Sequence, residues 1–271
     1  MTEPRPFLVG GEWRTSDRVF EVRFPYSGEV VAQLYEPTER DLDDAVVAAQ
    51  RGFEITRKLP AHARSQILYR LIDQMEQRTE ELIETLIIEG GKARKVAGGE
   101  VGRAIETVRV AAEEAKRVTG EMVPIDWTEA GENRVAFVRR LPLGIVLGIA
   151  PFNYPLNLAC HKLAPAIAAG NAFILKPATT TPLSALLLGE MVLAAGFPPE
   201  ALSVLPVPGA MAESLVADPR IAFFSFTGSS QVGWHLKSVA GRKRVGLELG
   251  GNAAAIVHED ANLNYAVSRI A

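Results

Sequence analysis

The chain alternates between segments whose apolar residues recur every three to four positions and short runs that are almost wholly apolar. The first spacing is typical of helices, and the second of strands buried on both faces. A capping signal, Thr38 with Asp41, begins the first helical segment, and Gly90-Gly91 ends the second. The pattern predicts helices over 39–53, 61–89, 96–118, 155–169, 181–195, 210–217 and 230–240, with another starting near Asp260.

Before residue 38 the sequence predicts only short strands and turns. Between about 121 and 141, two β-prone runs flank the polar turn Glu-Ala-Gly-Glu-Asn, which predicts a protruding β-hairpin. Because an isolated hairpin is marginally stable in water, we expect this one to pack against something else, such as another subunit.

From Leu143 onward the rhythm becomes strand, loop, helix. This alternation implies parallel strands joined by helical crossovers, so the predicted fold class is α/β with a Rossmann-like, doubly wound parallel sheet. The N-terminal helices and the protruding hairpin are additions to that sheet. The expected strands lie within 144–151, 171–177, 202–209, 221–230 and 244–257.

The composition indicates an ordinary soluble globular protein, with 48% hydrophobic and 23% charged residues. A net charge of −3 argues against a nucleic-acid or anionic-membrane partner. No apolar run reaches membrane-spanning length, and no secretory signal pattern opens the chain. A single cysteine excludes an intrachain disulfide framework and suits a reducing compartment, so we expect a cytoplasmic protein.

Ligands of doubly wound sheets bind beyond the carboxyl ends of the strands, and unusual polar residues follow the predicted strands there. Thr227, Gly228 and Ser229 turn from a strand into a helix, where backbone N–H groups suit a phosphate. Lys176 ends another strand and can reach a ribose hydroxyl or a phosphate. A simple capped turn and a solvated lysine are the alternative interpretations.

Two further residues suggest chemistry. Asn153 follows the strand of "GIVLGIAP", where its amide can donate to a developing oxyanion, although an asparagine turn with a helix cap is the alternative. Glu248 lies in the apolar run "RVGLELGGNAAAIV", which predicts a buried strand. A buried carboxylate needs a partner, or its pKa rises toward neutrality.

Cys160 has His161 beside it, but neighbours in sequence do not face each other on a helix. We therefore interpret Cys160 as a buried structural residue rather than a nucleophile. We also predict no metal site, because the histidines lack the spacing of metal ligands; they are His62, His161, His235 and His258.

Four stretches, in this order, resemble landmarks of the aldehyde dehydrogenase superfamily: "PFNYPLN", "KLAPAIAAGNAFILKPA", "FTGSSQVG" and "LELGGN". The resemblance runs from about residue 7 to the C-terminus. "IAPFNYPLN" and "KPAT" are most similar to the lactaldehyde and non-phosphorylating glyceraldehyde-3-phosphate dehydrogenase-like branches. The resemblance implies oxidation of a small aldehyde to a carboxylic acid with NAD or NADP, through a cysteine thiohemiacetal and thioester.

Site residues follow from the same resemblance. It implies that Asn153 stabilises the oxyanion and that Glu248 is the general base for the thiol or the hydrolytic water. It also implies a cofactor site with Lys176 on the adenosine ribose and Ser229 on the pyrophosphate. The cofactor-binding positions are Ile149, Ala150, Pro151, Phe152, Lys176, Thr179, Gly209, Phe226, Thr227, Gly228, Ser229, Val232, Leu249 and Gly250.

Two departures from the family pattern affect these expectations. Thr179 stands where NAD-preferring members often have a glutamate that repels a 2′-phosphate, so we expect NADP to be accepted. The Gly-Gln-x-Cys-type motif with the nucleophilic cysteine is also missing before the chain ends at Ala271. We therefore expect a truncated chain that is inactive alone. The alternative is a non-catalytic dinucleotide-binding fragment or an interaction remnant.

The resemblance also divides the chain. Residues 1–120 would supply the N-terminal strands and helices of the cofactor-binding domain, 121–141 an oligomerisation hairpin, and 142–271 the Rossmann-like NAD(P)-binding core. The catalytic domain would be absent. The hairpin predicts a homo-dimer or tetramer for the full-length form.

Overall fold

A computed structural model describes residues 3–270. Within that range a seven-stranded sheet forms the centre, in the order β11-β10-β7-β8-β9-β1-β2. The strands from β11 to β9 pair in parallel, whereas β1 is antiparallel to both β9 and β2. The strands are β1 Phe7–Val9, β2 Glu12–Arg14, β7 Ile145–Ile149, β8 Ala172–Lys176, β9 Leu202–Val204, β10 Ile221–Thr227 and β11 Arg244–Glu248.

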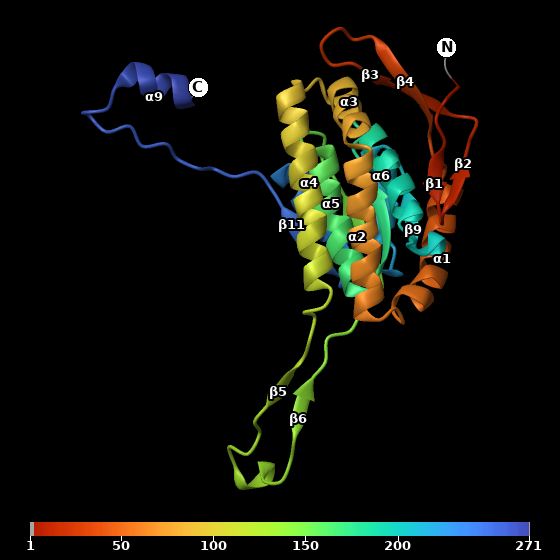
Figure 1. Cartoon of the computed structure of the whole chain (residues 1–271), viewed down its shortest axis with the longest axis vertical. Coiled ribbons are helices and arrows are strands. Elements are labelled where there is room, and N and C mark those ends of the chain that lie inside the picture. Colours follow the sequence, from red (N-terminus) through yellow and green to blue (C-terminus); the bar gives the residue numbers. More distant parts are fainter. Residues whose placement is uncertain (1–2, 271) are drawn as a thin grey trace.

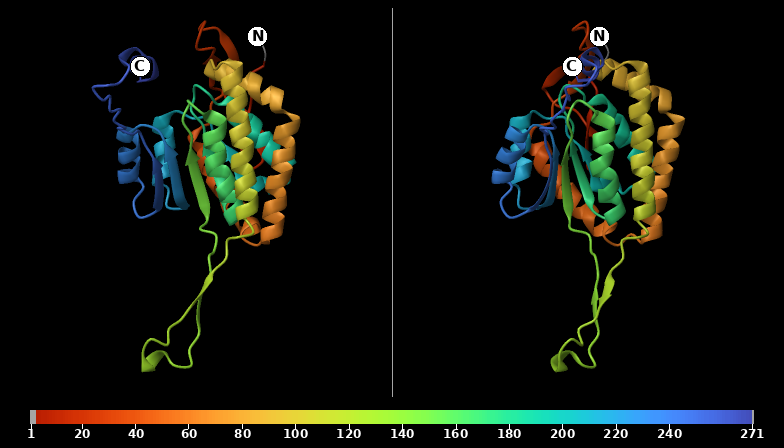
Figure 2. Two further views of the ribbon diagram at one scale, coloured as in Figure 1. Left: turned by 60° about the vertical axis from the view of Figure 1, so that its left-hand side comes forward. Right: turned by 90° about the vertical axis from the view of Figure 1, so that its left-hand side faces the viewer.

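Helices cover both faces of this sheet, so the predicted doubly wound α/β fold is confirmed (Figure 2). One face carries α5 and α6, and α2, α3 and α4 pack outside these two helices. The other face carries α1, α7 and α8. The helices are α1 Glu39–Thr56, α2 Ala61–Gln77, α3 Thr79–Gly90, α4 Arg94–Glu114, α5 Pro155–Ala169, α6 Leu183–Ala194, α7 Gly209–Ala217 and α8 Ser230–Val239.

The central strands β7 and β8 and the helix α5 are buried because their sequences are mostly apolar. Every residue of β7 and β8 is buried, as expected for parallel strands covered on both faces. Helix α5 lies between the sheet and α4, so it is buried on nearly all sides. It ends at Gly170, whose φ of 83° is left-handed, a conformation that glycine adopts without strain.

Two small antiparallel pairs lie outside the main sheet: β3 (Val19–Arg23) with β4 (Val30–Tyr35), and β5 (Glu121–Val123) with β6 (Ala136–Val138). The β5–β6 pair is the predicted hairpin and projects from the body of the molecule (Figure 2). Short 3₁₀ turns lie at Glu129–Gly131 in its tip and at Pro199–Ala201 before β9.

The helix expected over 61–89 is wrong as a single element. The structure divides it into α2 and α3 at Arg78, whose φ and ψ are −108° and 25°. The hydroxyl of Thr79 bonds to the carbonyls of Met75 and Glu76 there, which competes with the regular helical pattern. Because apolar residues continue across the break, periodicity alone could not locate it.

The buried strand expected over 244–257 is also wrong. Strand β11 ends at Glu248, and residues 249–262 have no regular helix or strand before α9 (Leu263–Ile270). Within residues 3–270, β11 pairs only with β10 and forms an edge of the sheet, so its residues are half-buried or exposed. The segment after it extends away from the body (Figure 1).

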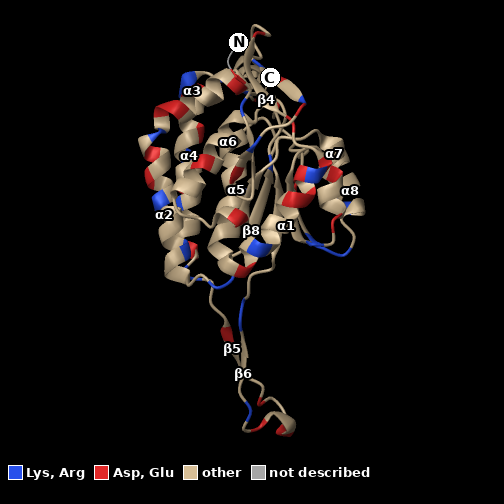
Figure 3. Cartoon of the chain, turned by 90° about the vertical axis from the view of Figure 1, so that its right-hand side faces the viewer, with Lys and Arg blue, Asp and Glu red and all other residues tan. Residues whose placement is uncertain are grey.

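Positive and negative side chains are interspersed over the outer helices (Figure 3). Among residues 3–270, no helix is both long and apolar enough to cross a membrane.

Candidate cofactor and catalytic site

A hollow of about 750 Å³ lies beyond the carboxyl ends of β7, β10 and β11. We call it the cofactor hollow. The structure brings nine of the residues predicted from the sequence to its wall: Pro151, Phe152, Asn153, Thr227, Gly228, Ser229, Glu248, Leu249 and Gly250. Leu158, His161, Lys162 and Ser225 complete the lining.

The turn from β10 into α8 forms one wall of this hollow. Ser229 is the N-cap of α8 and accepts a hydrogen bond from the backbone N–H of Val232 (3.4 Å). The N–H of Gly228 donates to the carbonyl of Glu248 (3.0 Å), which ties the turn to β11. A Cβ at Gly228 would lie 2.6 Å from the ring of Phe226, so a larger residue would displace the turn. Phe226 itself is buried, and its ring packs against the turn at Gly228.

A helix N-terminus beside glycine is a suitable anion site, because its unpaired N–H groups and the helix dipole both favour negative charge. Residues 228 and 229 present this end of α8 to the cofactor hollow. The arrangement fits a pyrophosphate.

Lys176 ends β8 and is buried, and its ammonium forms no hydrogen bond or salt bridge within residues 3–270. Burial lowers its pKa to about 8. A buried cation without a partner is costly, and a polar ligand bound beside it would lower that cost. Lys176 does not line the cofactor hollow.

A second, smaller hollow of about 370 Å³ contains Thr179, together with Thr180, Arg23, Glu36 and Pro208. Pro208 directly precedes Gly209, the first residue of α7. The structure therefore brings two chain segments that are distant in the sequence, one with Thr179 and one with Pro208 beside Gly209, to the same hollow. The remaining predicted positions do not line either hollow: Ile149 and Ala150 are buried, and Val232 is exposed on α8.

Asn153 is exposed at the start of the α5 connection. Its Oδ1 accepts a hydrogen bond from the backbone N–H of Tyr154 (2.9 Å). Because a backbone N–H can only donate, the side-chain atom that faces it is the oxygen and not the amide nitrogen. The amide nitrogen forms no hydrogen bond within residues 3–270 and therefore remains available as a donor to a ligand.

Glu248 is exposed at the end of β11, which corrects the expectation that it lies in a buried strand. The physical reason is the strand order, because an edge strand has no sheet neighbour to cover its outer side in residues 3–270. The side chain nevertheless lines the same hollow as Asn153.

Lys162 is the residue that the sequence analysis missed. It is buried in α5, and its Nζ donates to Thr227 Oγ1 (2.8 Å) and lies 3.2 Å from Ser225 Oγ. Burial lowers its pKa to about 8, and the charge of Glu248 acts in the opposite direction. A lysine in a mostly apolar helix was the signal present in the sequence.

Cys160 is fully buried, and burial raises the pKa of its thiol. The expectation that it is buried is confirmed, and a nucleophilic thiol requires an accessible thiolate. Among residues 3–270 no group of three His, Cys, Asp or Glu side chains has an arrangement that could hold a metal ion.

Comparison with known proteins identifies the class. Residues 13–271 match the model of the aldehyde dehydrogenase family, and the chain belongs to this family. A 3-sulfolactaldehyde dehydrogenase of Priestia megaterium is 43% identical over 263 residues, which are 97% of this chain and 55% of that protein. An NADP-dependent glyceraldehyde-3-phosphate dehydrogenase of Streptococcus equinus is 35% identical and covers 100% of this chain and 57% of its own length.

A solved structure of an aldehyde dehydrogenase also matches the fold of this chain. The NADP-dependent glyceraldehyde-3-phosphate dehydrogenase of Bacillus halodurans, complexed with NADP, matches with a TM-score of 0.94 and 36% identity over 99% of this chain and 57% of that one. The chain thus spans about half the length of the relatives that it matches. At the level of the family, relatives include NADP-dependent enzymes.

Proposed function

We propose that this chain supplies the cofactor site, the oxyanion-stabilising amide and the general base of an NAD(P)-dependent aldehyde dehydrogenase. One observation carries the proposal: Asn153, Glu248 and the N-terminus of α8 line a single hollow at the strand ends. Because the chain belongs to the aldehyde dehydrogenase family, we assign cofactor binding and aldehyde oxidation to this hollow.

In the proposed reaction a cysteine thiolate attacks the aldehyde carbon, a hydride leaves it, and water then hydrolyses the thioester to a carboxylic acid. The bound dinucleotide supplies the hydride acceptor. Asn153 would donate from its amide nitrogen to the oxyanion that forms on attack. Glu248 would accept the proton of the thiol or of the hydrolytic water. Cys160 is too buried to be the thiol, so another cysteine would supply it.

For the cofactor, the N–H groups at Gly228 and Ser229 would bind the pyrophosphate, and Lys176 would bond to the adenosine ribose. Pro151, Phe152, Leu249 and Gly250 would line the trough, as the cofactor hollow supports. Ile149, Ala150, Phe226, Gly209 and Val232 would support or flank it. Position 179 in the smaller hollow carries a threonine and not a glutamate that would repel a 2′-phosphate, so we propose that NADP is accepted.

The three-part division of the chain and its oligomeric form belong to the same proposal. Met122, Trp127 and Phe137 on the hairpin are each at least three-quarters exposed, at 76%, 80% and 76%. Large apolar side chains at such exposure favour burial against a partner. We propose that the hairpin contacts another subunit in a homo-dimer or tetramer.

The test combines a binding measurement on this chain with a turnover measurement on the full-length protein that supplies the nucleophilic cysteine. Titration with NADP⁺ and NAD⁺ by tryptophan fluorescence should give saturable binding. Aldehyde-dependent formation of NADPH should then be lost in Glu248→Gln while cofactor binding is kept. Absence of binding by both dinucleotides would overturn the proposal. Binding without turnover, at saturating aldehyde, would favour a non-catalytic dinucleotide-binding role.

A further inference from the structure

Lys162 is a buried amine that the proposed reaction does not use. It belongs to α5 and is only 6% exposed, yet it lines the cofactor hollow together with Asn153 and Glu248. The hollow has a volume of about 750 Å³, which leaves room for a small molecule beside the lysine. A nucleophilic group therefore borders the space that the proposed function assigns to ligands.

The hydrogen-bond partners of Lys162 are two hydroxyl groups. Its Nζ lies 2.8 Å from Thr227 Oγ1 and 3.2 Å from Ser225 Oγ, both on β10. An ammonium has three N–H donors, whereas a neutral amine has two and a lone pair. The two hydroxyl oxygens satisfy the donors of the neutral form. Because Nζ has no third partner within residues 3–270, the lone pair is free to face the hollow.

No carboxylate holds Lys162 in an ion pair within residues 3–270, in contrast to Lys92, which is paired with the buried Glu100. Burial lowers the pKa of Lys162 to about 8, and the charge of Glu248 opposes this shift only in part. About half of the amine is therefore neutral at pH 8, the form that acts as a nucleophile.

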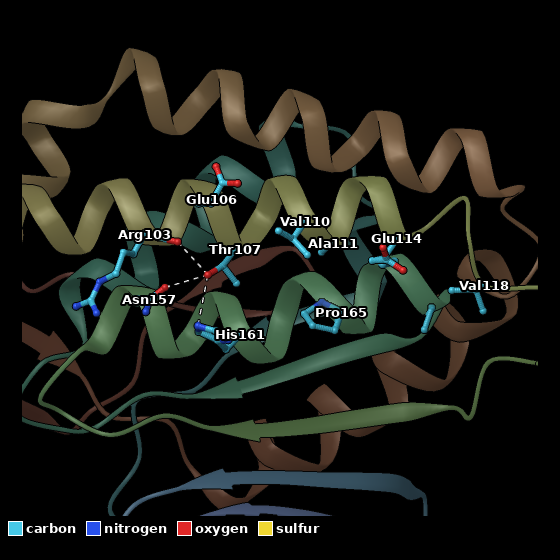
Figure 4. Close-up of a pocket in the computed structure, with 12 residues that line it drawn as sticks. Arg103, Glu106, Thr107, Val110, Ala111, Glu114, Val118, Asn157, His161 and Pro165 are labelled. Atoms are coloured by element: carbon cyan, nitrogen blue, oxygen red, sulfur yellow. Dashed lines mark hydrogen bonds between the residues drawn. The ribbon is translucent and has the colours of Figure 1, made fainter.

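His161 and Glu248 are the other two titratable side chains that line the hollow. The ring Nε2 of His161 lies 3.4 Å from the hydroxyl of Thr107 on α4 (Figure 4). Burial and the neighbouring charges of Lys162 and Arg103 lower the pKa of His161, so its imidazole is neutral at pH 8. A neutral imidazole and a carboxylate can both transfer protons to and from a group that reacts in the hollow.

We propose that Lys162 binds small aldehydes covalently and reversibly, as an imine, in the cofactor hollow. The activity requires neither a dinucleotide nor a thiol, and it rests on the proposed function only in that an aldehyde enters this hollow. The lone pair of Nζ attacks the carbonyl carbon, the C=O π electrons move to the oxygen, and one proton passes from nitrogen to oxygen. The carbinolamine then loses its hydroxyl group and the second N–H proton as water, which leaves a C=N bond.

The hydroxyl partners are compatible with both states of the lysine. The imine nitrogen has no N–H left to donate and offers a lone pair instead. The hydroxyl of Ser225 or Thr227 can rotate and donate to it, because a hydroxyl is both a donor and an acceptor. An ionised carboxylate in the same place could only accept, so it would favour the ammonium over the imine.

The experiment treats this chain with propanal and sodium cyanoborohydride at pH 8, without cofactor. The reductant converts each imine into a stable propylamine, and peptide mass spectrometry follows the propyl group on each lysine over time. Two lysines of the same digest are internal comparisons. Lys176 is also buried, with a pKa of about 8, but does not line the hollow, and Lys237 is exposed on α8.

We expect Lys162 to be modified at least about tenfold faster than either comparison lysine. The neutral fraction of an amine rises about tenfold for each unit by which its pKa falls, which favours Lys162 over an ordinary lysine. Access from the hollow favours it over Lys176. Modification of Lys162 no faster than that of Lys237 would overturn the proposal. Equal rates at Lys162 and Lys176 would also overturn it, because the hollow would then have no effect on reactivity.

The matched variant is Lys162→Arg, which keeps a cation that can donate to Ser225 and Thr227 but has no amine that forms an imine. The fast modification should be absent in it, with the rate at Lys237 unchanged; a fast modification that persists would contradict the assignment to Lys162. The comparison of three lysines in the native chain does not depend on this variant. Because no dinucleotide is present, failure of NADP⁺ to bind would overturn the proposed function and leave the imine result standing.

Discussion

Glu89 and Glu100 stabilise the first turns of two neighbouring helices in the same way. Glu100 accepts hydrogen bonds from the backbone N–H groups of Leu156 (3.0 Å) and Asn157 (3.1 Å) at the start of α5. Glu89 accepts from Leu183 (2.6 Å) and Ser184 (3.2 Å) at the start of α6. Neither helix has a side-chain N-cap of its own, so each depends on a carboxylate from another helix.

Replacing Glu100 by Gln should destabilise the protein. The half-buried Lys92 would lose its ion-pair partner, and one of the two oxygens of the buried Glu100 would become an NH₂ group. Breaking a buried pair from one side costs about 3 kcal/mol in the free energy of unfolding, measured by urea titration. The matched variant Glu114→Gln removes the exposed pair with Arg117 and should cost less than about 1 kcal/mol. Equal costs would contradict this role of Glu100.

Glu89→Gln should change how stability depends on pH. Burial raises the pKa of Glu89 to about 7 from an ordinary value of 4.5. A raised carboxyl pKa contributes stability that is complete below pH 4.5 and is lost as pH rises through 7. The difference in unfolding free energy between Glu89→Gln and the native protein should therefore shift in favour of the variant, by on the order of 3 kcal/mol, across this window. A flat difference for Glu89→Gln would disprove the assignment.

Gly228→Ala should weaken cofactor binding. The added Cβ would lie 2.6 Å from the ring of Phe226, so the turn that presents the α8 N-terminus must move. We expect the Kd for NADP⁺ to rise at least about tenfold, since one displaced charged hydrogen bond costs about 1.5 kcal/mol or more. Gly102→Ala, with open space around its Cβ position in α4, is the control and should bind normally. Unchanged affinity in Gly228→Ala would exclude this turn from the cofactor site.

Thr179→Glu should shift cofactor preference toward NAD⁺. A carboxylate in the smaller hollow would accept hydrogen bonds from ribose hydroxyls and repel a 2′-phosphate there. The ratio of kcat/KM for NADP⁺ to that for NAD⁺ is expected to fall at least about tenfold, as for one lost or gained charged contact. An unchanged ratio in Thr179→Glu would show that this position does not discriminate between NADP⁺ and NAD⁺.

The sequence predicted the layers of the fold and the strand ends that carry polar residues, because apolar periodicity and strand–helix alternation are local signals. It could not predict that β11 forms an edge, since strand order depends on contacts between distant segments. The exposure of Glu248 follows from that order. Lys162 was missed for a different reason: its partners, Ser225 and Thr227, lie on another strand, and only the assembled sheet brings them to it. The lysine in an otherwise apolar helix was the available clue.

The central claim is that the amide of Asn153 acts on the reacting aldehyde and not on the cofactor. Its most direct test is aldehyde-dependent NADPH formation by Asn153→Ala in the full-length protein that supplies the nucleophilic cysteine, with NADP⁺ affinity measured on the same preparation. We predict a fall in kcat of about 10²- to 10³-fold, the usual effect of removing one oxyanion donor, with an unchanged Kd for NADP⁺. An unchanged kcat, or a Kd for NADP⁺ that weakens in proportion to the lost activity, would contradict the account.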